Sequence, residues 1–130
     1  MRFDLLDEYS TLVPFGLGVS RNGAFQDPAV PAKAAERGKI TYIAADGTKS
    51  TIGQLESAEA LAATFKPGEW NQFHLIARGN TLVHIVNGHV TAVCIDDDLK
   101  NRSMGGLIGV QLHAGPPMKL ELRNVAIKLK

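Results

Sequence analysis

The dipeptide Asn87-Gly88 is the strongest local constraint in this chain, because it lies between two apolar-rich stretches of alternating residues. Asn-Gly favours a two-residue type I′ turn, in which both central residues take positive φ angles. The dipeptide therefore predicts a β-hairpin with strands at 82–86 and 89–95. Its register gives four cross-strand pairs: Val86 with His89, Ile85 with Val90, His84 with Thr91 and Val83 with Ala92.

Similar turn signals recur along the rest of the chain. Asp46-Gly47 predicts a second hairpin, and Ser57 is a suitable N-cap for one short helix at 57–65. Alternating residues predict further strands at 2–6, 39–45, 48–53, 69–78, 106–113 and 118–129, the last with a bulge near Arg123-Asn124. Short strands separated by frequent turns indicate an all-β, antiparallel sandwich or barrel.

The hairpin register divides the side chains between two faces of a sheet. The face expected to be the core carries mostly branched or small residues: Val83, Ile85, Val90, Ala92, Cys94, Ile108, Val110 and Leu112. His84 and Thr91 are then expected on the opposite face. A three-residue loop, Gly79-Asn80-Thr81, is predicted in preference to a two-residue Gly79-Asn80 turn, because it brings Phe73 and Leu75 onto the core face.

The face opposite this core is expected to be polar. It gathers imidazole and amide groups: His74, His84, His89, Gln111 and His113. A curved sheet with such a face would form a carbohydrate-binding groove, while each histidine taken singly is also explained as an ordinary solvated strand residue. Trp70, beside a turn, is a candidate for stacking on a sugar ring or for capping the core.

Common catalytic and metal-binding motifs are absent from the sequence. It contains no nucleophile elbow, phosphate-binding loop, zinc-protease helix or dinucleotide fingerprint. Asp96-Asp97-Asp98 lacks the alternating ligands of an EF-hand and is expected to be a solvated loop. The single cysteine, Cys94, excludes an intramolecular disulfide and a multi-cysteine zinc site. The cofactor stays unknown, with a divalent metal left open although the histidines lack zinc-like spacing.

Charge and hydropathy limit the partners of the chain. Its 130 residues include 14 Lys and Arg against 13 Asp and Glu, a formal net charge of +1. Because phosphate backbones select strongly basic proteins, this balance argues against nucleic acid as the main partner. No apolar run is long enough to span a bilayer. The first residues show no signal peptide, and the cellular location stays unknown.

The segment Lys66–Lys130 resembles the 3-keto-disaccharide hydrolase family, formerly a domain of unknown function. The matching stretches, in chain order, are Gly68-Glu69-Trp70-Asn71, Ala77-Arg78-Gly79-Asn80, Val86-Asn87-Gly88, the run from Gly106 to Met118, and Leu122 to Lys128. A thinner likeness extends upstream through Leu6-Asp7-Glu8-Tyr9 and Glu36-Arg37-Gly38 to Asp46-Gly47.

The resemblance implies a concanavalin A-like jelly roll of two antiparallel sheets, similar in shape to laminin-G domains. Residues 1–130 are then expected to form a single, partial domain, incomplete at its N-terminus because the family's opening strands are not recognisable. Sheet edges left open in this way would favour a homodimer. Members of the family are bacterial and often exported.

The resemblance also implies a chemistry. A ketone at C3 of a sugar acidifies the hydrogen at C2, so a general base can remove that proton and the oxygen at C1 then leaves; water addition completes a hydrolysis. From facing and motif match, His113 is expected to be the base or a metal ligand, Gln111 to orient the substrate, and His84 to be a further catalytic candidate.

A carbohydrate is the expected substrate, and the substrate-binding candidates are Glu36, Arg37 and Trp70. Two alternatives remain open beside the enzyme. One is a carbohydrate-binding sandwich without catalysis, and the other is an inactive, truncated member of the family. A pocket where His113 and Gln111 converge with a carboxylate would favour the enzyme, whereas a shallow surface with an exposed Trp70 would favour the binding module.

Overall fold

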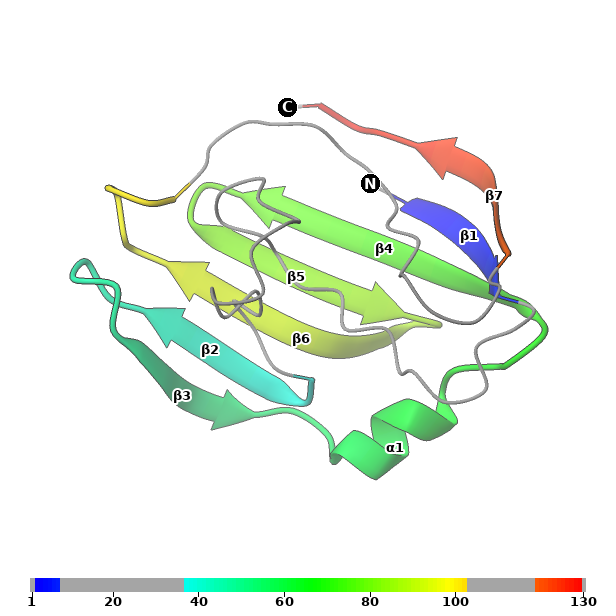
Figure 1. Cartoon of the computed structure of the whole chain (residues 1–130), viewed down its shortest axis with the longest axis horizontal. Coiled ribbons are helices and arrows are strands. Elements are labelled where there is room, and N and C mark those ends of the chain that lie inside the picture. The colour runs from blue at the N-terminus through cyan, green and yellow to red at the C-terminus, as the bar shows by residue number, and fades with distance from the viewer. Residues whose placement is uncertain (1, 8–36, 103–118, 130) are drawn as a thin grey trace.

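The structure, a computed structural model, describes residues 2–7, 37–102 and 119–129. These residues form a seven-stranded sheet in the order β3-β2-β6-β5-β4-β1-β7 (Figure 1). The strands are β1 (Arg2–Asp7), β2 (Lys39–Ile43), β3 (Lys49–Gln54), β4 (Trp70–Arg78), β5 (Thr81–Val86), β6 (His89–Asp96) and β7 (Leu120–Ala126). One short helix, α1 (Ala58–Ala63), connects β3 to β4 in this part of the chain.

The predicted fold class is confirmed: the described residues are mostly strands with a single short helix, consistent with an all-β sandwich. Each element lies within a few residues of its predicted bounds, and Ser57 caps α1 by accepting a hydrogen bond from the Ala60 amide. One pair departs from the antiparallel expectation, because β2 lies parallel to β6. The predicted strand at 106–113 lies outside the described residues.

The two tight turns around β5 set the register of the central strands. Asn87 and Gly88 have φ angles of 49° and 87°, as a type I′ turn requires. At the other end of β5, Arg78 pairs with Thr81, so the turn has two residues, Gly79 and Asn80. The predicted three-residue loop is therefore wrong. Gly79, with φ of 59°, supplies the positive φ angle that lets two residues close this hairpin.

A β-bulge in β6 corrects the predicted faces. The pairs Val86–His89 and Ile85–Val90 are as predicted, but His84 pairs with Ala92 because Thr91 is an extra residue. The extra residue reverses the alternation for the remainder of β6. Cys94 consequently lies across from Leu82 rather than on the face of Val83, and His84 shares its face with Cys94.

The core of the described residues lies on this His84 face. Phe73 and Val86 form one buried cluster, which contacts Phe65, Leu75 and Leu120. Ile43 and Cys94 form a second cluster with Leu82. Cys94 is buried as predicted, whereas Val83, Ile85 and Val90 are half-buried on the other face, which corrects their assignment to the core.

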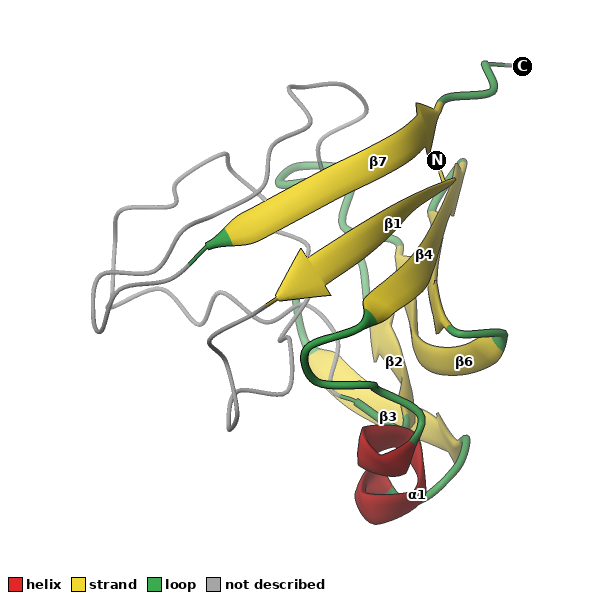
Figure 2. Cartoon of the chain, turned by 90° about the vertical axis from the view of Figure 1, so that its right-hand side faces the viewer, coloured by secondary structure: helices red, strands yellow, loops and turns green. Residues whose placement is uncertain are grey.

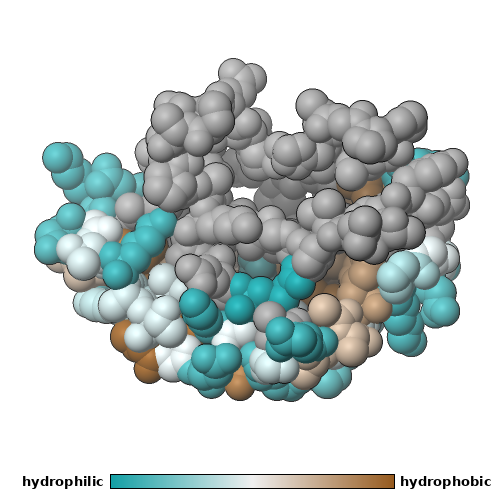
Figure 3. Space-filling view, turned by 60° about the horizontal axis from the view of Figure 1, so that its bottom comes forward, coloured by the Kyte–Doolittle hydropathy of each residue, from teal (hydrophilic) through white to brown (hydrophobic). Residues whose placement is uncertain are grey.

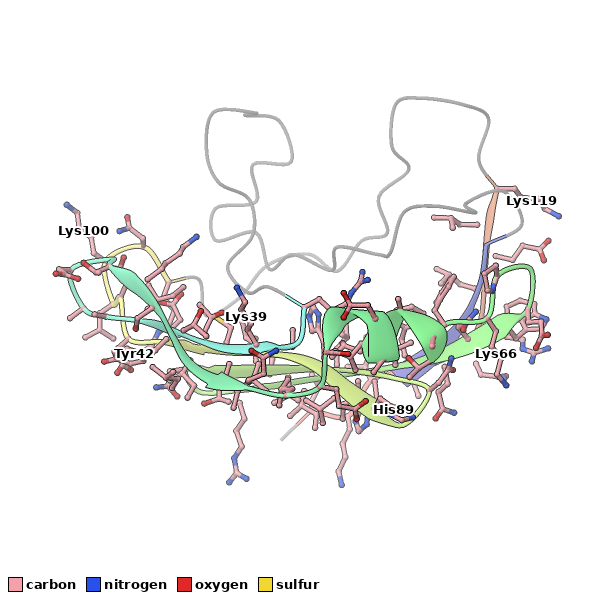
Figure 4. All side chains as sticks on the ribbon, turned by 90° about the horizontal axis from the view of Figure 1, so that it is seen from below. Lys39, Tyr42, Lys66, His89, Lys100 and Lys119 are labelled. Carbon is pink, nitrogen blue, oxygen red and sulfur yellow. The ribbon has the colours of Figure 1, made fainter. Side chains whose placement is uncertain are left out.

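The sheet is curved, and its two faces are distinct in shape. Seen from below, the strands form a shallow bowl, with Lys39 on the concave side (Figure 4). Every second residue of a strand lies on the same face, so Lys39 shares its face of β2 with Thr41 and the buried Ile43. The buried clusters therefore lie on the concave face. Figure 2 shows β4, β1 and β7 side by side at one end of the sheet, where β1 pairs with both neighbours.

Candidate functional site

The described residues include three of the predicted site residues: His84, Arg37 and Trp70. The other three, His113, Gln111 and Glu36, lie outside the described residues. Their predicted roles therefore stay predictions.

His84 lies in the middle of β5, on the concave face. Its neighbours directly across the sheet are Leu75 of β4 and Ala92 of β6, which carry no charge. Burial lowers the pKa of the His84 imidazole below its ordinary value. The ring is therefore neutral at neutral pH, and a neutral imidazole has a nitrogen that can accept a proton.

Arg37 lies just before β2, and the next residue fixes its place. Gly38 is buried and has a φ angle of 78°. Its amide donates to the Thr91 carbonyl and its carbonyl accepts from the Leu55 amide, both at 2.8 Å. The Arg37-Gly38 turn is thereby fastened to the bulge in β6. Burial lowers the pKa of the half-buried Arg37 guanidinium.

Trp70 begins β4 and lies on the convex face, because it alternates with the buried Asn71 and Phe73. The Arg123 guanidinium of β7 lies over its ring, 4.0 Å from the ring centroid. This contact extends across β1, which separates β4 from β7. The structure does not bring Trp70 and His84 onto one face, so a sugar on Trp70 would lie across the sheet from His84.

The other described histidines do not join His84 in a polar surface. His74 pairs with Ile85 and lies on the convex face with Trp70. His89 lies at the rim of the sheet (Figure 4), where its Nδ1 is 3.3 Å from a Glu56 carboxylate oxygen. The expectation that these three histidines share one face is wrong for His74, because the two-residue Gly79-Asn80 turn places Leu75 rather than His74 on the face of His84. His89 pairs with Val86, which lies on the face of His84.

Two asparagines from the matching stretches join the start of β4 to the β5–β6 turn. The fully buried Asn71 accepts hydrogen bonds from the Lys66 amide and from Asn87 Nδ2, both at 2.8 Å, and donates to the carbonyls of Lys66 and Glu69. Asn87 also donates to the Thr64 carbonyl and accepts from the Gln72 amide. Their side-chain amides therefore maintain the fold, which explains their place in these stretches without catalysis.

A third asparagine from the matching stretches, Asn80, fastens the opposite end of β5. Its side chain donates to Asp97 at 2.8 Å, and Tyr42 donates to the other oxygen of the same carboxylate at 2.9 Å. The hydrogen bonds from Asn80 and Tyr42 lower the pKa of Asp97. The bond to Asp97 in turn raises the pKa of Tyr42.

The acidic stretch after β6 corrects the expectation of a solvated loop. Asp96 and Asp98 are buried. Asp98 accepts hydrogen bonds from the backbone amides of Lys100 and Asn101 and from the Asn101 side chain. The carboxylate therefore organises the turn that follows β6.

Metal-binding clusters and membrane spans can be assessed for residues 2–7, 37–102 and 119–129. No three His, Cys, Asp or Glu side chains in these ranges are close enough together to hold a metal ion. Within the same ranges, no helix has the length and apolar character needed to span a membrane.

The edges of the sheet bear on the expected homodimer. β3 is an edge strand on which the polar residues Lys49, Ser50 and Thr51 are exposed together with the apolar Ile52. The lower side of the molecule in Figure 3 shows hydrophilic and hydrophobic residues side by side. Polar and charged edge strands oppose pairing with another sheet. A homodimer through the sheet edges has no support from this edge and stays a prediction.

Comparison with known proteins agrees with the resemblance drawn from the sequence. Searches of the curated proteins and of the solved structures gave no significant match. A family model described as a 3-keto-alpha-glucoside-1,2-lyase-like domain matches residues 20–128, which is most of the 130-residue chain and includes the β2–β7 part of the sheet. The chain belongs to this family of 3-keto-alpha-glucoside-1,2-lyase-like domains, as its resemblance to the 3-keto-disaccharide hydrolases predicted.

Proposed function

We propose that this domain cleaves 3-keto-glycosides by elimination. A base removes the C2 proton, the electrons of the C–H bond pass toward the C3 ketone as an enolate, and the C1–O bond then breaks to release the aglycone alcohol. Addition of water to the unsaturated sugar completes a hydrolysis. The match of residues 20–128 to the lyase-like family carries this proposal.

The base in this proposal is His113, with Gln111 orienting the sugar, and His84 is the second candidate. The environment of His84 supports its candidacy, because burial holds the imidazole neutral and so ready to accept a proton. Among the described residues, its cross-strand neighbours Leu75 and Ala92 carry no charge and so do not favour the protonated form. Arg37 and Glu36 are proposed to bind the substrate.

The test is release of p-nitrophenol from a p-nitrophenyl 3-keto-α-glucoside, with and without added divalent metal. The unoxidised glucoside should not be cleaved, because its C2 hydrogen is not acidic. H113A and H84Q are compared with Q54A, a change at an exposed position of edge strand β3. Loss of the general base should lower kcat by about 10²- to 10⁴-fold, while Q54A should match the wild type.

The pair of histidine variants identifies the base. A large loss in H113A alone assigns that role to His113, and a large loss in H84Q alone assigns it to His84. Wild-type protein that cleaves no 3-keto-glycoside under any of these conditions would exclude the proposed reaction for this chain.

A second candidate function, sugar binding without catalysis, is favoured by one row of side chains. The convex face of β4 carries every second residue at the start of the strand, and these three side chains are half-buried: Trp70, Gln72 and His74. An aromatic ring beside amide and imidazole groups can contact both the faces and the hydroxyls of a sugar. Because Trp70 is the single tryptophan, its fluorescence should change on titration with an unoxidised disaccharide if this surface binds sugar.

A further inference from the structure

The bulge in β6 leaves one residue outside the strand pairing. Ile85 pairs with Val90, and the preceding residue of β5, His84, pairs with Ala92. Thr91 therefore has no residue opposite it. Thr91 is nevertheless buried, with 8% of its surface exposed. A buried polar residue at a bulge must satisfy its groups outside the ladder, and the partners it uses show which segments the bulge holds.

Thr91 bonds to the candidate His84 and to Gly38, the residue that follows the candidate Arg37. Its hydroxyl donates to the His84 carbonyl at 3.3 Å. Its own carbonyl accepts from the Gly38 amide at 2.8 Å, next to Arg37. One residue therefore joins the backbone of a catalytic candidate to the turn that carries a substrate-binding candidate.

We propose that Thr91 is a positioning residue, which holds the His84 backbone and the Arg37-Gly38 turn in a fixed relation to each other. This role rests on the proposed function, because it concerns the same site. The Thr91 hydroxyl is the group that bonds to the His84 backbone, and a substitution can remove it. The backbone carbonyl of residue 91, which bonds to Gly38, is retained in every variant. A small displacement of a reacting group is costly: about 1 Å can reduce a rate on the order of 10²-fold.

The experiment compares four variants that separate the hydroxyl from the bulk of the side chain. T91V and T91A lack the hydroxyl, T91S retains it, and T41V removes a hydroxyl from an equally buried threonine of β2, which has 6% of its surface exposed. Three quantities are measured: the NMR titration midpoint of the His84 imidazole, assigned by its loss in H84Q, and the kcat and KM for the 3-keto-glucoside.

In T91V, a loosened bulge should admit water to His84, and its midpoint should rise toward the ordinary histidine value. The neighbours facing His84 across the sheet are Leu75, Ala92 and, diagonally, Phe73, Ala77 and Cys94, so among these described residues only the Cys94 thiol titrates. We expect kcat to fall roughly 10-fold or more, with KM changed less, because the reacting geometry is disturbed. T91S should restore both values, and T41V should leave the His84 midpoint unchanged.

An unchanged His84 midpoint and unchanged kcat in folded T91V or T91A would overturn the proposal, as would an equal shift in T41V. If neither T91V nor T91A folds while T91S does, Thr91 serves the fold alone and the positioning role is also overturned. Absence of turnover in the wild type would reject the proposed function, whereas the NMR titration would still decide whether Thr91 positions His84.

Discussion

Asn71 has no exposed surface, and its side-chain amide connects the segment before β4 to the β5–β6 turn. Its oxygen accepts from Lys66 and Asn87, and its nitrogen donates to Lys66 and Glu69. The sequence marked this asparagine only as part of a matching stretch. Its structural role depends on the approach of the β5–β6 turn, from 16 residues away, which no local pattern contains.

Replacing Asn71 should therefore be costly. N71A removes the side-chain partner of the Lys66 amide and of the Glu69 carbonyl, and one of two partners of the Lys66 carbonyl and of Asn87 Nδ2. Each buried group left unpaired costs about 1–3 kcal/mol. With partial entry of water, we expect a loss of about 2–4 kcal/mol in the free energy of unfolding, measured by urea denaturation. Q54A, at the exposed edge of the sheet, should change it by less than about 0.5 kcal/mol. A loss in N71A no larger than in Q54A would contradict the network.

His84 gives the stability a definite pH dependence. Its pKa is lowered in the folded state, so at mildly acidic pH the unfolded chain binds more protons than the folded one. Stability should therefore fall as the pH drops from about 7 through the ordinary histidine range near 6.5, by at most about 1.4 kcal/mol per pH unit for one proton. H84Q should flatten this slope in urea denaturation between about pH 7 and 5; an identical slope in both proteins would show that His84 does not contribute.

The elements themselves could largely be predicted from local sequence, but the relation between their faces could not. Alternation and Asn87-Gly88 located β4, β5, β6 and the type I′ turn, because these signals act over a few residues. The bulge at Thr91 has no comparable signal, since it depends on the partner strand and on Gly38. The two-residue Gly79-Asn80 turn places Phe73 and Leu75 on the face of His84, and the bulge adds Cys94 to it. The face that was expected to be polar is therefore the concave core face.

The turn between β5 and β6 supplies a test of this local signal. Gly88 has a φ angle of 87°, and a Cβ added there would meet no atom within 4 Å, so any cost of G88A comes from the backbone. An L-residue in this region costs about 1–2 kcal/mol, whereas asparagine tolerates it better. We expect G88A to lower the unfolding free energy by about that amount and G88N to lower it less. Equal stability of G88A and the wild type would show that the turn does not require positive φ at this position.

At the scale of the whole molecule, one end of the sheet is built from strands that lie far apart in the sequence. β1 lies between β4 and β7, so residues 2–7 connect the final strand to the rest of the sheet. The sequence predicted these strands and the bulge near Asn124, where φ is 55° and the β1–β7 register shifts. It did not predict their adjacency, because pairing between strands so far apart depends on the assembled sheet. The family match explains the scaffold, but the candidates Gln111 and His113 stay predictions.

The contact between Trp70 and Arg123 offers a direct test of this arrangement. Because Trp70 is the single tryptophan, its emission reports on the guanidinium that lies 4.0 Å from its ring and reaches it across β1. Deleting residues 2–7 should release β7 from the sheet, move the Trp70 emission to longer wavelength and lower the unfolding free energy. R123A should give a similar spectral shift at a cost of only about 0.5–1 kcal/mol, the usual strength of an exposed cation–π contact. A deletion variant with the wild-type emission and stability would mean that β1 does not connect β4 to β7 in solution.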